Sequence, residues 1–480
     1  MVSLWRPRLL SSLLYVFSLS YFATRFSASV ICSLLLAGCV TLDTPELPTH
    51  TPTSWSEQSP KNAPAIALRS WWQTWQDPTL NALIDEALTA NLDLAQATQR
   101  LESERLIAGR WQSPFLPTIT AGARPTQDVS ATDMYYHASL DMTWELGLFG
   151  ALDNSKLSAN ARLYQAEATE QGTRVIVIAN VVRHYLALGL SQKQQQLLQH
   201  QLTLDEETLE LALTRQRAHL GTPEESTQAQ LRLAQTRANL ALEREASSRS
   251  ARALAVLLGR EQPDSAWTQI NAPLQAPAFT LTELPADLLR TRPDIHTAEA
   301  DVLQAAAQVG LARSALFPRL SLGGSILYAY NTTQNMRTST DYAPSVGLYV
   351  DIPLWDWGQR RTRMQANESL LDAALLGYRK AVLDGVSEVE NALSGLTHQQ
   401  ERIQALESSE QALKKQQQSQ RTLQSLGLSS RYDQLLQQRA VLETQSDLWR
   451  AHAARTLSFI ALYKALGGAP LPEKPEETTP

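Results

Sequence analysis

Cysteine is almost absent from this 480-residue chain, which holds only Cys32 and Cys39. Cys32 lies inside an apolar N-terminal stretch that reads as an export signal, so an exported chain keeps one cysteine and forms no internal disulfide. Basic residues are not in excess either, because 42 lysines and arginines face 48 acidic residues. That balance lacks the positive field on which nucleic-acid binding depends, and we expect no nucleic-acid partner.

Motifs for catalysis and metal binding are also missing from the sequence. The eight histidines are scattered, and no HExxH, C-x-x-C, glycine-rich phosphate loop or nucleophile elbow occurs. The few methionines do not pair at ligand spacing. We interpret the acidic pairs at 206–207 and 224–225 as solvated helix charges. The sequence therefore predicts no enzyme, no cofactor and no metal.

Residues 1–38 carry three arginines, no acidic residue and two apolar runs, a pattern that predicts an export signal. The signal is long, which leaves the true translation start open. It ends in Leu36-Ala37-Gly38-Cys39, which is similar to the bacterial lipobox, where the cysteine becomes the lipidated first residue. Val40 follows in place of the aspartate that retains such lipoproteins in the inner membrane, so the similarity implies outer-membrane lipid. The alternative is a plain signal peptide with an incidental cysteine.

The chain that follows is one repeat used twice. Segments 113–122 and 314–323 both pass from a helix pattern through a proline into a strand pattern, 201 residues apart. Segments 144–150 and 352–358 correspond at a spacing of 208 residues, and 215–221 and 421–427 at a spacing of 206. Such internal repeats decide the architecture. Each copy reads helix, two strands, very long helix, turn and returning helix.

The repeat gives the domain boundaries. Proline-rich residues 39–64 form an extended tether, and residues 65–262 form the first copy. A connector at 263–285 leads to the second copy at 286–468, and the tail at 469–480 is predicted to be disordered. In the first copy we expect a helix over 78–112, a helix over 153–219 of about 95 Å, and a return to residue 258. The long helices of the second copy run over 360–426 and 429–466.

The strand segments are amphipathic. Residues 136–146 and 345–354 alternate apolar and polar side chains, and Asp141, Glu145 and Asp351 lie on the polar side. Such strands fit a transmembrane barrel with a wet lumen, where these three carboxylates are solvated lumen charges. A soluble, half-buried sheet shows the same alternation. We favour the barrel because we find no helical membrane span after residue 38 and because of the motif at Cys39.

Four strands cannot close a barrel, and unpaired strand edges in lipid cost several kcal/mol per group. The chain must therefore associate with further copies to complete the barrel. Two copies would supply eight strands and three would supply twelve, and the sequence alone does not choose between them.

The whole pattern resembles the TolC-type outer-membrane efflux proteins, specifically their lipoprotein branch. Segments 71–100, 292–322 and 426–445 carry the resemblance, which covers about residues 65–468. It implies a mainly α fold with membrane β: a homotrimeric β-barrel of four strands per chain, continued by a long periplasmic α-helical barrel. It also implies the exit duct of a tripartite efflux or secretion pump that passes small molecules such as drugs. The partners implied are a periplasmic membrane-fusion adaptor and an inner-membrane transporter of the resistance-nodulation-division type.

Two other classes of protein remain as alternatives. A structural adaptor lipoprotein would need only one helical hairpin and no membrane strands, so the duplicated strand pairs speak against it. An envelope enzyme has no support in the sequence.

The resemblance also implies where the partners and the gate lie. The far ends of the long helices are expected to dock the adaptor: Leu220, Gly221 and Thr222 in the first copy, and Leu426, Gly427 and Leu428 in the second. In the family an aspartate after the second turn forms a gate, and Asp433 matches it. Leu436 and Ser429 replace the family's second aspartate and its arginine. Arg431 would then pair with Asp433 across a subunit boundary, unless both are plain solvated charges or the closure is apolar, through Leu428, Tyr432 and Leu436.

Overall fold

The computed structural model describes residues 47, 52–56, 66–127, 134–269, 272, 275–279, 285–287, 291–331 and 342–471. Cys39, the signal and most of the tether lie outside these residues, as does most of the tail. Two compact units are present. The sheet-bearing unit contains the described residues within 105–162 and 300–375, and the helical unit contains those within 48–104, 163–299 and 376–480.

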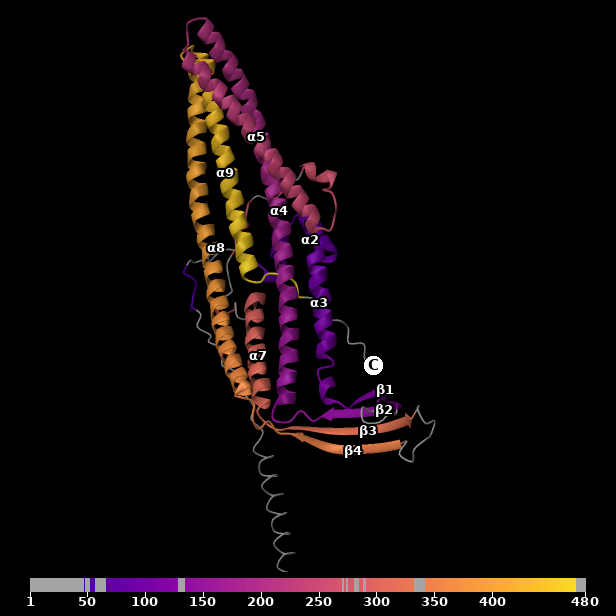
Figure 1. Ribbon diagram of the computed structural model, residues 1–480. Coiled ribbons are helices and arrows are strands. Elements are labelled where there is room, and N and C mark those ends of the chain that lie inside the picture. Colours follow the sequence, from indigo (N-terminus) through magenta and orange to yellow (C-terminus); the bar gives the residue numbers. More distant parts are fainter. Residues whose placement is uncertain are drawn as a thin grey trace, which may run out of the picture. The chain divides into compact units, whose positions relative to one another are not determined.

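The sheet-bearing unit is built on one antiparallel sheet of four strands in the order β1-β2-β3-β4 (Figure 1). The strands are β1 (Thr118–Gln127), β2 (Met134–Glu145), β3 (Arg319–Asn331) and β4 (Tyr342–Asp351). Pro117 and Pro318 each stand one residue before a strand, where proline ends the preceding helical conformation. Because β2 pairs with β3, the strand pairs of the two copies join into a single sheet.

The long helices also follow the duplication. Both α4 (Ala151–Arg217) and α8 (Gln359–Ser425) have 67 residues, and both α5 (Pro223–Leu257) and α9 (Arg431–Ala465) have 35. The start of α8 lies 359 − 151 = 208 residues after the start of α4, and the same difference separates α9 from α5. The spacing of 206 residues that the sequence suggested for the turns is therefore wrong. At the true spacing Thr222 corresponds to Ser430, and both residues cap the helix that follows.

The first predicted helix is two helices, α2 (Pro78–Ala90) and α3 (Leu92–Ala108). Asn91 between them is extended, with φ −67° and ψ 126°. Its side-chain oxygen accepts a hydrogen bond from the Leu94 amide at 3.0 Å, and its side-chain amide donates to the Leu257 carbonyl at 2.9 Å. Asparagine side chains compete with a helix for backbone hydrogen bonds. The prediction of a single helix over 78–112 is therefore wrong.

The helical unit has an aromatic core in which the first and the last described helices meet. Trp71, in η1 (Leu68–Trp75), is 1% exposed and stacks on Tyr463 at 5.6 Å between ring centroids. Its indole N–H donates to the Gly468 carbonyl at 3.0 Å. Phe459 packs edge-on against the same indole. Residues near the start of the first copy and the end of the second therefore share one core.

Buried Arg292, directly before α7 (Pro293–Ser314), fixes the first turn of that helix in the same unit. It donates to the Ala465 carbonyl at 2.7 Å and to Glu388 at 2.9 Å. Breaking a buried cation's contacts is costly, so this arginine fixes where α7 begins. Three short 3-10 helices complete the described elements: η2 (Ser113–Phe115), η3 (Ser265–Gln269) and η4 (Pro285–Asp287).

One described helix, α4, contains a window long and apolar enough to cross a membrane by length and composition. The sequence-based expectation that no such helix follows residue 38 is therefore too simple. However, 61% of that window is buried within the fold. An apolar helix that is covered by its own chain is typical of a protein core.

Candidate functional site

The four-stranded sheet has one polar and one apolar face. Residues directly opposite one another on antiparallel strands share a face, so each row across the sheet can be followed through the register. One polar row consists of Thr120, Asp141, Ser325 and Ser345. The neighbouring row, on the other face, consists of Ile119, Met142, Gly324 and Val346. The alternation predicted for two segments therefore extends across all four strands.

Asp141 is held by the polar face of the sheet. Its carboxylate accepts hydrogen bonds from the Ser139 hydroxyl at 2.7 Å and the Ser325 hydroxyl at 2.6 Å. Ser139 is on the same strand and Ser325 on the next, so two hydroxyl groups from adjacent strands fix the orientation of the carboxylate. Sequence reasoning placed Asp141 on this face but missed its two serine donors.

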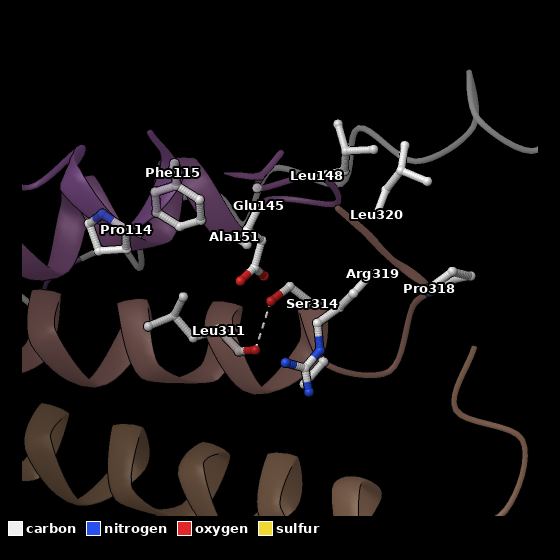
Figure 2. Close-up of a pocket in the computed structure, with 12 residues that line it drawn as sticks. Pro114, Phe115, Glu145, Leu148, Ala151, Leu311, Ser314, Pro318, Arg319 and Leu320 are labelled. Atoms are coloured by element: carbon white, nitrogen blue, oxygen red, sulfur yellow. Dashed lines mark hydrogen bonds between the residues drawn. The ribbon is translucent and has the colours of Figure 1, made fainter. Parts of the chain in front are cut away.

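Glu145 and Asp351 belong to the same face, at the strand ends that adjoin the helices. Glu145 lines a cavity of about 290 Å³ together with Ser314 at the end of α7 and Arg319 at the start of β3. Figure 2 shows the Glu145 carboxylate and the Arg319 side chain on the α7 side of the strand end, while Leu148 and Leu320 lie on the other side. Asp351 is opposite Arg319 in the register. All three predicted carboxylates thus lie on the polar face.

The apolar face is exposed to an unusual degree. Val346 is 78% exposed, Ile119 66% and Leu348 60%. The other residues in their rows across the sheet are also apolar or glycine, so the exposed surface is continuous and apolar. A soluble sheet buries such a face against a second layer. Large exposed apolar patches mark surfaces that another molecule or a membrane covers.

The two outer strands of this sheet, β1 and β4, each have a single strand neighbour among the described residues. Within the described part of the chain, the outer edges of β1 and β4 offer their backbone donors and acceptors to no further strand. In lipid these groups must be paired, so the sheet is an arc that further strands have to complete.

The two turns at the far ends of the long helices share a backbone conformation and differ in their packing. His219 and Gly427, which correspond at the spacing of 208 residues, are both left-handed, with φ 58° and 74°. Gly221 in the first turn is tightly enclosed, since an added Cβ would lie 2.8 Å from the Glu225 carboxylate, whereas Gly427 has open space around it. Leu220 and Leu428 are 73% and 72% exposed. Thr222 and Ser430 cap the returning helices, and Leu426 is exposed beside Gly427.

The predicted gate residues surround the start of α9, and their partners lie within the chain. Arg431 forms a two-point ion pair with Glu207 of α4, at 2.8 and 2.9 Å. Asp433 forms a capping box with Ser430. The Arg215 guanidinium lies over the Tyr432 ring at 5.4 Å, and Leu436 is half-buried. An Arg431–Asp433 pair across a subunit boundary stays a prediction, since one chain does not test it.

Glu207 is the functional candidate that sequence reasoning missed, because it was interpreted as a solvated charge. Hydrogen bonds from Arg431 lower its pKa below the ordinary range of glutamate. Its neighbour Glu206 pairs with Arg237 of α5 at 3.1 Å. Nothing in the sequence signals the pairing of Glu207, because Arg431 follows it by 224 residues.

A second polar link joins three helices near these turns. Asp205 of α4 is 3% exposed and accepts a hydrogen bond from the Thr236 hydroxyl of α5 at 2.6 Å. Arg439 of α9 donates to both oxygens of the same carboxylate. A buried carboxylate of this kind is stable only with such partners. It therefore fixes the position of α9 against the α4–α5 hairpin.

No group of three or more histidine, cysteine, aspartate or glutamate side chains that could hold a metal occurs among the described residues. What the described residues offer is a set of surfaces: a two-faced sheet, free strand edges and exposed turns.

Comparisons with known proteins agree with this arrangement. A family model described as "Outer membrane efflux protein" matches residues 83–260 and 284–468. The chain is 28% identical to Nodulation protein T of Rhizobium leguminosarum bv. viciae, over 94% of this chain and 96% of that protein. It is also 28% identical to the pyoverdine export outer membrane protein OpmQ of Pseudomonas aeruginosa, over 91% and 95% of the two chains. Among solved structures, the outer-membrane channel OprN matches with a TM-score of 0.73 at 27% identity, over 89% of this chain and 99% of that one.

Proposed function

The chain belongs to the outer membrane efflux protein family, and we propose that three copies of it form the exit duct of a tripartite pump. It is a non-enzymatic outer-membrane efflux channel. In this proposal the strands of three copies close a barrel in the outer membrane, and the long helices continue the duct into the periplasm. Small molecules pass along the polar faces of the strands. The duct itself supplies no energy.

The observation that carries the proposal is the two-faced sheet with free edges. Four strands per chain with apolar residues on one face suit a barrel surface in lipid, and the polar face with Asp141, Glu145 and Asp351 suits a wet lumen. Pairing of β1 in one copy with β4 in the next removes every free edge. Three copies give twelve strands, the number that the family resemblance implies.

Two adjacent positions on β4 test this assignment of faces. Val346→Arg places a charge on the apolar face, where it costs about 2–4 kcal/mol near the bilayer midplane. Ser345→Arg places the same charge on the polar face and is the matched control. We expect the Val346 variant to be lost from the outer-membrane fraction while the Ser345 variant remains. Equal recovery of both variants would contradict a lipid-facing Val346.

The partners proposed are a periplasmic membrane-fusion adaptor and an inner-membrane resistance-nodulation-division transporter. We assign adaptor docking to the two turns, because their leucines Leu220 and Leu428 are exposed to the same extent. Tryptophan at either position should abolish efflux and leave assembly intact. Unchanged drug resistance in both variants would place docking elsewhere.

The gate is proposed to close by drawing the turns together. Its support is the ion pair of Arg431 with Glu207, which joins the start of α9 to α4. The pair is partly exposed, so it contributes only about 0.2–1 kcal/mol in one chain. Near a threefold axis it occurs three times, and a combined contribution of about 0.6–3 kcal/mol changes the closed-to-open ratio roughly three- to 150-fold.

Anchoring to the outer membrane through lipid on Cys39 completes the proposal, and it rests on the sequence Leu36-Ala37-Gly38-Cys39. Mass spectrometry of the mature N-terminus should find a diacyl or triacyl group on that cysteine. An unmodified terminus at another residue would remove this part of the proposal.

A further inference from the structure

A second cavity in the sheet-bearing unit, of about 380 Å³, lies between the last turns of α7 and the first turns of α8. It shares Leu311, Ala315 and Arg319 with the smaller cavity beside Glu145. One wall comes from the last turns of α7 and the residue after it, and it is apolar except for Gln308. The opposite wall comes from the start of α8, and Arg319 enters from the start of β3.

The residues that line this cavity are positive in a chain that is negative as a whole. Three arginines and one aspartate give a formal charge of 3 − 1 = +2, whereas the whole chain carries −6. The arginines are Arg319, Arg360 and Arg363. Arg319 belongs to β3, whereas the other two belong to α8. The fold therefore brings together arginines that are distant in the sequence.

The single aspartate is already engaged by its own segment. Asp356 accepts hydrogen bonds from the backbone amides of Gly358 and Arg360, each at 3.1 Å. It also accepts from the Arg360 side chain at 3.3 Å. Its oxygens thus cap α8 and hold Arg360 at the edge of the cavity, and they do not reach the other two arginines.

Arg319 and Arg363 have no carboxylate within ion-pair distance among the described residues. Asp351 is opposite Arg319 in the strand register but forms no ion pair with it. Figure 2 shows the Arg319 side chain extending from the strand end toward the end of α7, by Ser314. Two guanidinium groups therefore border this cavity without an ion-pair partner among the described residues.

We propose that this cavity is a phosphate-binding pocket for an amphiphile whose apolar part lies against Leu311 and Ala312 of α7 and Ala315 directly after it. Guanidinium groups match the planar, two-point geometry of phosphate oxygens better than any other side chain. The apolar wall favours a phosphate ester over a free ion. Phospholipid headgroups and soluble organic phosphates share this chemistry.

The position of the pocket favours the membrane as the source. Trp355 and Trp357 flank Asp356 and are 77% and 89% exposed. Exposed tryptophans next to membrane strands lie at the level of the lipid headgroups, and basic pockets at that level bind anionic headgroups. The inference is independent of gating, cargo and adaptor docking, and it holds whether or not the chain conducts.

The test uses the purified full-length protein and two probes, glycerol 3-phosphate in calorimetry and phosphatidylglycerol in native mass spectrometry. Arg363→Gln removes one unpaired cation from the pocket. Arg361→Gln is the matched control, because Arg361 lies two residues away on α8 and does not line the cavity. We expect the Arg363 variant to bind about tenfold more weakly, since one charged hydrogen bond is lost, and the Arg361 variant to match the parent.

Weaker binding of phosphatidylglycerol, with or without weaker binding of glycerol 3-phosphate, identifies the membrane as the source. Weaker binding of glycerol 3-phosphate by a protein that does not bind phosphatidylglycerol identifies a soluble phosphate ester. Arg319→Gln, on a different element, replaces Arg363→Gln if that variant does not assemble. The proposal is overturned if the parent binds neither probe, or if the Arg363 and Arg361 variants bind both probes equally.

Discussion

The two copies of the repeat share a backbone and differ in what covers their helices. α4 and α8 are equal in length, and left-handed residues recur at corresponding positions before them. Phe149 and Trp357 have φ values of 56° and 58°, and Gly150 and Gly358 both have 83°. Local geometry has therefore been kept through the duplication, even where the residue type has changed.

The burial of the two long helices differs between the copies. Ala168 and Val175 on α4 are each 4% exposed, whereas their counterparts on α8, Leu376 and Leu383, are 67% and 57% exposed. The larger apolar side chains are thus on the uncovered helix. They are seven residues apart, the spacing of a coiled-coil seam. We infer that the α8 seam, defined by Leu376 and Leu383, is covered by another copy of the chain.

The largest effect is expected from charging this seam. The double variant Leu376→Asp, Leu383→Asp loses the burial of two leucines, about 1.5–3 kcal/mol each per copy, and buries two charges. Native mass spectrometry should find monomer in place of trimer, with helicity by circular dichroism retained. The double methionine variant keeps the apolar volume and should remain trimeric. A trimeric aspartate variant would mean that the seam does not lie between copies.

A smaller effect is expected from changes at the turns. Of the two copies, only the second has a cationic residue at the first position of the returning helix. Position 431 is arginine, while its counterpart 208 residues earlier is Pro223. Arg431→Glu should raise the open-to-closed ratio in single-channel recordings roughly three- to 150-fold, because three ion pairs become repulsive. Glu207→Arg added to this variant should restore closure if the pair within one chain holds the gate.

The other electrostatic possibility is a pair of Arg431 with Asp433 across a subunit boundary. In that case Asp433→Arg added to Arg431→Glu should restore closure, whereas a pair within one chain predicts no such rescue. If neither second change has an effect and Arg431→Glu conducts like the parent, the closure is apolar, through Leu428, Tyr432 and Leu436.

The smallest effect concerns the two helix caps. Ser430 forms a capping box with Asp433, whereas Thr222 accepts only one longer bond, from the Glu225 amide at 3.4 Å. Ser430→Ala should cost about 1 kcal/mol, which accelerates local amide exchange at the start of α9 about fivefold. Thr222→Ala should change exchange at the start of α5 less. A larger change at the first turn would reverse this ranking.

Features that depend on local sequence were predicted well. Alternation along 136–146 identified a strand because successive side chains point to opposite faces, and the prolines before β1 and β3 marked where the helix pattern stops. The long helices end within two residues of the predicted positions, since glycine and proline at the turns are strong local signals.

Features that depend on distant partners were not predicted. Asn91 breaks a helix partly because it bonds to Leu257, 166 residues away. Asp205 and Glu207 look like ordinary helix charges until α9 places arginines beside them. The cation cluster at Arg319 likewise required β3 and α8 to meet, which no pattern along the chain encodes.

If the polar strand face lines a duct across the membrane, the purified full-length protein added to a planar lipid bilayer should carry current in discrete conductance steps. Ser345→Arg on the polar face should alter the ion selectivity of these steps without abolishing them. A protein that assembles as a trimer in the bilayer and carries no current would show that the polar face does not line a duct.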